Sequence, residues 1–76
     1  MKKGVAVLTE RDHISNTIRF EVDGERAFID LGSSVIPGID LLATAKDGDR
    51  FTVEYNFTPS GSGKTGALIS NILGAA

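Results

Sequence analysis

The sequence predicts a mainly β protein: a small five-strand antiparallel barrel followed by a short C-terminal segment that is either helical or simply apolar. Three observations lead to this prediction. Several short segments alternate between apolar and polar residues, which is the period of a strand with one buried face. Turn-forming residues separate these segments at intervals of roughly 8–12 residues, as in small barrels and sandwiches. Closing such a short sheet into a barrel also removes exposed strand edges.

The first half of the chain predicts three strands. A β-branched apolar run favours a first strand, and clean alternation follows in the second, where Phe20 and its apolar neighbours face away from Arg19. The Asp23-Gly24 pair suits a tight hairpin, since glycine tolerates a positive φ. The predicted order is a strand at residues 3–10, a polar loop at 11–16, a strand at 17–22, the hairpin turn, and a strand at about 25–31.

The middle of the chain contains a break, an ambiguous segment and the clearest strand. Residues 32–38 include Pro37-Gly38, a strong turn signal. Residues 39–45 fit either a strand or a short helix, and the sequence leaves both open. A second turn at 46–49 leads into a strand at 50–58, whose aromatic residues are expected in the core with Phe20. These aromatic residues are Phe51, Tyr55 and Phe57.

The last part of the chain is predicted as a separate segment. We divide the chain into a barrel at 1–58, a flexible joint at 59–63 and an apolar segment at 64–76. Apolar residues recur at helical spacing within the last segment, so it could form a short helix over about 64–73. Because such a helix is too short to be stable alone, it is expected to pack on the barrel or on another chain.

Composition narrows the classes of function. The chain is 41% hydrophobic and 24% charged, which is ordinary for one small soluble domain. It has no cysteine and a single histidine, His13, which excludes disulfides, thiolate sites and multi-histidine metal sites. No apolar run approaches the ~20 residues of a membrane span, and the stretch after Lys2 and Lys3 is too short for a secretory signal. We therefore expect a cytoplasmic protein with no membrane attachment.

The net charge argues against tight binding to a highly charged partner such as nucleic acid. The formal net charge is −2, so tight binding driven by many phosphate contacts is not expected. Arg11, Arg19 and Arg26 could nevertheless form a local positive stripe once the strands bring them together. The alternative is a mixed, solvated surface.

Several segments within residues 3–57 follow one another in a recognisable order. They are Lys3-Gly4-Val5, Val22-Asp23-Gly24, Ala27-Phe28-Ile29-Asp30, Ser33-Ser34-Val35-Ile36 and residues 47–54. Together they resemble the cold-shock domain, a five-strand oligonucleotide-binding barrel; an SH3-like barrel is the alternative at this length. The aromatic platform of that family is mostly missing: only Phe28 matches a base-stacking position, and Asp30 stands where the family has histidine.

Two function hypotheses follow, and neither is enzymatic. The first is weak or non-specific binding of single-stranded nucleic acid through the face of the second and third strands. Its candidate residues are Phe28, Arg19, Arg26, Arg11 and His13. The second is a protein-interaction or assembly module, including self-association, that uses the C-terminal segment. Its candidate residues are Leu68, Ile69, Ile72 and Leu73. For Phe28 the alternative is packing beneath the C-terminal segment.

The chemistry-bearing motifs are weak. Residues 58–65 resemble a phosphate-binding loop, but Thr58 replaces its first glycine and no α/β pattern accompanies it, so at most a weak phosphate contact by Lys64 is expected. His13 beside Asp12 lacks a nucleophile and is interpreted as a solvated loop residue. Asp47 and Asp49 are interpreted as turn formers. We expect no catalytic group, no metal and no cofactor.

Overall fold

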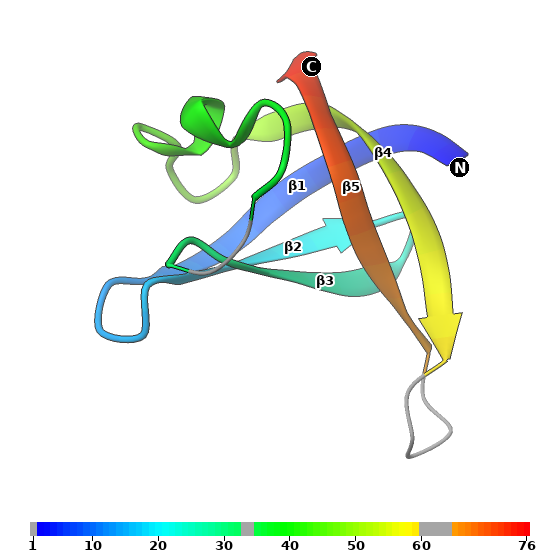
Figure 1. Ribbon diagram of the computed structural model, residues 1–76, viewed down its shortest axis with the longest axis horizontal. Coiled ribbons are helices and arrows are strands. Elements are labelled where there is room, and N and C mark those ends of the chain that lie inside the picture. The colour runs from blue at the N-terminus through cyan, green and yellow to red at the C-terminus, as the bar shows by residue number, and fades with distance from the viewer. Residues whose placement is uncertain (1, 33–34, 60–64) are drawn as a thin grey trace.

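The computed structural model describes residues 2–32, 35–59 and 65–76, and the predicted mainly β five-strand barrel is confirmed. The strands close into a barrel in the neighbour order β1-β2-β3-β5-β4 (Figure 1). The elements in chain order are β1 (Lys2–Asp12), β2 (Thr17–Val22), β3 (Glu25–Asp30), a 3-10 helix η1 (Ile39–Leu42), β4 (Arg50–Pro59) and β5 (Thr65–Ala75).

The topology is a Greek key with one added strand. Strands β1, β2 and β3 form an antiparallel meander, and β4 returns to pair with the free edge of β1. Strand β5 then fills the space between β4 and β3. It is antiparallel to β4 and parallel to β3, where Ala27 aligns with Ala67. The barrel is therefore antiparallel at every strand pair except β3–β5.

The β2–β3 hairpin forms as the sequence predicts. Asp23 and Gly24 have φ values of 53° and 81°. Two successive positive φ values are typical of the two-residue hairpin turn whose twist matches the strands it joins. The turn fixes the register, so Phe20 faces Ala27 inside the barrel, while Arg19 faces Phe28 outside it.

Strand β1 is longer than predicted and contains a bulge. Leu8 pairs with Phe20 and Glu10 pairs with Arg19, so Thr9 is an extra residue without a partner on β2. Beyond the bulge, β1 continues to Asp12. The predicted loop at 11–16 is therefore shortened to the turn at 13–16.

The core draws on every strand. Phe20 and Phe51 meet edge to face with ring centroids 6.2 Å apart. Phe57, which was expected in the core, is instead exposed, because it lies near the end of β4, where its ring meets the edge of Tyr55 and lies under the Lys2 ammonium. The buried residues are Ala6, Leu8, Ile18, Phe20, Val22, Ala27, Ile29, Leu42, Ala45, Phe51, Val53, Tyr55, Ala67, Ile69 and Ile72.

The ambiguous segment at 39–45 contains the short helix η1. Leu42 points into the core, and Ile36 and Ile39 pack against it. The chain leading into η1 lies against β5, where the Ile72 amide donates a hydrogen bond of 2.9 Å to the Pro37 carbonyl. Gly38 precedes η1 with φ 85°, so a glycine is favoured at this close approach.

The C-terminal segment is a strand, and the short helix that its apolar spacing allowed does not form. Residues 65–75 form β5, which is an integral strand of the barrel. The register shifts twice along β4–β5, skipping Ser70 and Leu73. The bulge at Ser70 lets Ile69 and Ile72 both face inward although they are three residues apart. This spacing resembles a helix, whereas the backbone is extended.

Two further expectations concern the connection and the membrane. Pro59 ends β4, and the rest of the predicted flexible joint lies outside the described residues. Within the described part of the chain, no helix has the length and hydrophobicity that a membrane crossing requires.

Candidate nucleic-acid interface

The strongest candidate site is a groove on the outer face of β1, β2 and β3. Alternation along the strands turns Arg19, Glu21, Arg26 and Phe28 away from the core. In the register of the sheet, Arg19 stands opposite Phe28, and Glu21 stands opposite Arg26. These side chains, together with Thr9 and Glu10 from β1, line a groove of about 350 Å³. Three of the predicted binding residues are thus brought together, namely Arg19, Arg26 and Phe28.

Phe28 does not pack beneath the C-terminal segment, which was the alternative interpretation of this residue. Its side chain is 57% exposed, so β5 does not cover it. The Arg19 guanidinium carbon lies over the ring, 5.2 Å from its centroid, in a cation–π arrangement. An exposed aromatic ring with a cation on its face can accept a second planar group by stacking.

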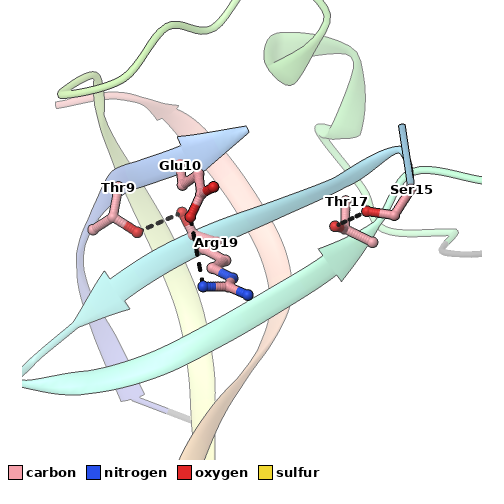
Figure 2. A network of polar contacts seen from close by, with 5 residues as sticks. All are labelled: Thr9, Glu10, Ser15, Thr17 and Arg19. Atoms are coloured by element: carbon pink, nitrogen blue, oxygen red, sulfur yellow. Dashed lines mark hydrogen bonds and ion pairs between the residues drawn. The ribbon is translucent and has the colours of Figure 1, made fainter. Parts of the chain in front are cut away.

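Arg19 is held in place from the side of β1 (Figure 2). Its Nη1 atom lies 3.5 Å from Oε2 of Glu10, and both side chains are more than half exposed. The Thr9 hydroxyl donates a 3.2 Å hydrogen bond to the Arg19 carbonyl. Because Thr9 is the bulged residue of β1, the irregularity in the strand brings both contacts to the same arginine.

The local positive stripe that the sequence allowed does not form. The outer rows around Phe28 carry Glu10, Glu21 and Asp30 alongside Arg19 and Arg26. Each of these two arginines has a carboxylate residue opposite it on the neighbouring strand. The surface is therefore mixed in charge, which was the alternative that the sequence left open.

Arg11, which was also predicted to bind nucleic acid, lies away from the Phe28 groove and contacts the η1 region. Its Nη1 donates to three carbonyl oxygens at the end of η1 and just beyond it, those of Leu42, Ala43 and Ala45, at 3.1, 3.2 and 3.4 Å. The Leu42 carbonyl also accepts the Ala45 amide at 3.3 Å, so Arg11 adds a second donor there and supplies a side-chain donor to the other two carbonyls. Arg11 therefore anchors η1 to β1 and does not line the Phe28 groove.

His13 is also separated from Phe28. It lies exposed in the β1–β2 turn and lines a different hollow with Arg11 and residues 43–47, of about 460 Å³. The turn itself is organised by Asp12, whose carboxylate accepts the amides of Ile14 and Ser15 at 2.9 and 3.3 Å. These hydrogen bonds lower the pKa of Asp12 below its usual value of 3.8.

The predicted partner-binding residues divide into two pairs. Ile69 and Ile72 are 3% and 4% exposed, so they belong to the core and their predicted role in a partner surface is wrong. Leu68 and Leu73 are 56% and 45% exposed on the outside of β5. The alignment of Ala27 with Ala67 places Leu68 one position along β5 and Phe28 one position along β3, so the two are neighbours on the outer face. Lys64 lies outside the described residues.

The acidic side chains in the described part of the chain do not form a metal site. No group of three or more histidine, aspartate or glutamate side chains there could hold a metal ion. Asp49 stabilises the turn at 46–49, as expected, since its carboxylate accepts a hydrogen bond of 2.9 Å from the Lys46 amide. The sequence interpretation missed Thr9 and Glu10, because only the β1 bulge, which has no signature in the sequence, turns them toward Arg19.

The molecule thus belongs to the class of small closed Greek-key β-barrels with a mixed-charge groove on one face. Comparisons of the chain with protein-family models, with curated proteins and with solved structures find no match. The chemistry of the groove is therefore the basis for inferring a function.

Proposed function

We propose that the chain is a non-enzymatic binding module that takes single-stranded nucleic acid weakly, and without strong sequence preference, on the outer face of β2 and β3. The observation that carries the proposal is the exposed Phe28 ring in a groove lined by Arg19 and Arg26. Bases of every kind stack on aromatic rings, and arginines contact the phosphates between them.

The topology supports the same proposal. Oligonucleotide-binding barrels are five-strand Greek-key barrels that bind their ligands on the face of strands 2 and 3. The present barrel has five strands in a Greek-key order, and its groove lies on that face. The sequence resemblance to the cold-shock domain adds Phe28 as a matching stacking position.

The groove also explains why binding is expected to be weak. It offers one exposed ring, and stacking contributes about 1–3 kcal/mol per base. Only two arginines line it, so log K should fall with log salt by a slope no steeper than about −1.4 for a single strand. The carboxylates of Glu10 and Glu21 repel phosphate and lower the affinity further.

Fluorescence anisotropy with a labelled oligothymidylate at low salt tests the proposal. Phe28→Ala should weaken binding by about 5- to 150-fold, the equivalent of one lost stacking contact. Phe28→Leu keeps apolar bulk but removes the ring, so it should lose nearly as much. Leu73→Ala, which also truncates an exposed apolar side chain but lies on β5, serves as the control. Wild-type protein that fails to bind at low salt, or full binding by Phe28→Leu, contradicts the proposal.

A second candidate is a protein-interaction or assembly module, and the exposure of Leu68 beside Phe28 favours it. Apolar side chains that are neighbours on a sheet face form a surface that a partner can cover. Self-association is the simplest form, and light scattering measures it directly. Leu68→Ser should reduce the mass to that of a monomer, whereas a wild-type protein already monomeric at high concentration counts against self-association. Removal of the C-terminal segment is unsuitable as a test, because it deletes β5.

A further inference from the structure

We infer that Glu10 competes with phosphate for Arg19. Its carboxylate pairs with Arg19 in the free protein and is displaced when a nucleic acid binds. The inference rests on the proposed function and concerns the regulation of that same groove. Its physical basis is one chain of contacts across three strands, from Glu10 on β1 through Arg19 on β2 to Phe28 on β3.

The geometry makes one guanidinium serve two neighbours. Arg19 lies 3.5 Å from the Glu10 carboxylate and, at the same time, over the Phe28 ring. A base that stacks on the covered face of Phe28 must take the place of Arg19. The guanidinium is then free to turn to the phosphate of the same ligand, provided that it leaves Glu10. Stacking and phosphate contact are therefore linked through this ion pair.

The chain contains a matched comparison for Glu10. Glu21 lines the same groove and stands opposite the other arginine, Arg26. Within the described residues, however, the ion pair is between Arg19 and Glu10, and no such contact joins Glu21 to Arg26. Replacing either glutamate by glutamine changes the net charge by the same amount. Only the change at Glu10 frees an arginine that the free protein keeps occupied.

Salt dependence distinguishes a displaced carboxylate from simple repulsion. When Arg19 turns from Glu10 to a phosphate, the phosphate releases a cation but the abandoned carboxylate attracts one. The two effects oppose each other, so Arg19 contributes less than a full phosphate contact to the salt slope of the wild-type protein. That slope should lie between about −0.7 and −1.4, whereas Glu10→Gln should bring it to about −1.4.

The test compares Glu10→Gln with Glu21→Gln in anisotropy titrations of a labelled oligothymidylate at several salt concentrations. Glu10→Gln should raise the affinity by up to about fivefold at low salt, the equivalent of an exposed ion pair, and should steepen the slope. Glu21→Gln should raise the affinity less and leave the slope unchanged. In an Arg19→Gln background, Glu10→Gln should act no differently from Glu21→Gln.

The outcomes separate the two proposals. If the wild-type protein and both glutamine variants fail to bind, the proposed function fails and the role of Glu10 fails with it. If the wild-type protein binds through Phe28 but the two glutamine variants have equal affinities and equal slopes, the groove still binds nucleic acid and only the competitor role is overturned. A retained advantage of Glu10→Gln over Glu21→Gln without Arg19 also overturns it.

Discussion

At Gly38, the addition of a single methyl group should strongly destabilise the barrel. Its φ is 85°, and a Cβ atom added there would overlap the carbonyl oxygen of Ile72 and lie 2.9 Å from the carbonyl carbon. Both atoms belong to the backbone of β5, so neither can rotate away. The Gly38→Ala variant must therefore move η1 away from the barrel or distort the strand.

Gly48 supplies the control for the magnitude. Its φ is 91°, but an added Cβ atom would meet nothing within 4 Å. Gly48→Ala should therefore cost only the left-handed conformation, about 1–2 kcal/mol. Gly38→Ala has that cost together with the lost hydrogen bond between the Ile72 amide and the Pro37 carbonyl and with loosened packing, for a total of about 3 kcal/mol or more.

Urea unfolding followed by far-ultraviolet circular dichroism gives the free energy of unfolding of both variants. Replacing glycine by alanine also stabilises a protein by restricting its unfolded chain, and this effect cancels when the two variants are compared. A loss of about 3 kcal/mol is a large share of the stability expected for a domain of this size. Equal free energies of unfolding for Gly38→Ala and Gly48→Ala would refute the close approach of η1 to β5.

Three further predictions concern single side chains. Arg11→Met should lower the free energy of unfolding by about 1–2 kcal/mol, because the carbonyls of Leu42, Ala43 and Ala45 lose the Arg11 donor, while oligonucleotide affinity stays unchanged in the same anisotropy titration. The lowered pKa of Asp12 contributes stability that is present above pH 3.8 and is lost as the pH falls through the folded value, so Asp12→Asn should flatten the acid limb of a plot of urea midpoint against pH. Burial, and then the hydrogen bond to Asp23, raise the pKa of Tyr55 above 10.0, so the associated stability is present below pH 10.0 and is lost as the pH rises through the folded value. Phenolate absorbance should show the late titration directly, because Tyr55 is the only tyrosine, and an ordinary midpoint would contradict it.

The parts of the fold that were predictable are those governed by local rules. The β2–β3 hairpin follows from strict alternation around Asp23-Gly24, and the register that places Phe28 opposite Arg19 follows from the turn. The outward orientation of Phe28 follows from the same alternation. These features depend on residues close together in the sequence.

The parts that could not be predicted depend on irregular backbone or on distant partners. The bulge at Ser70 gave β5 a helical spacing of apolar residues, and only pairing with β4 reveals the strand. The bulge at Thr9 likewise brought Glu10 to Arg19. Arg11 looked like a binding residue, because the carbonyls that accept its hydrogen bonds lie more than 30 residues away along the chain.

The position of β5 between β3 and β4 also has a consequence for incomplete chains. Without residues 65–75, β3 and β4 would each carry an edge with no neighbour, and such edges readily pair with other chains. A polypeptide cut short before β5 should therefore aggregate, and supplying the missing strand as a separate peptide should suppress that aggregation.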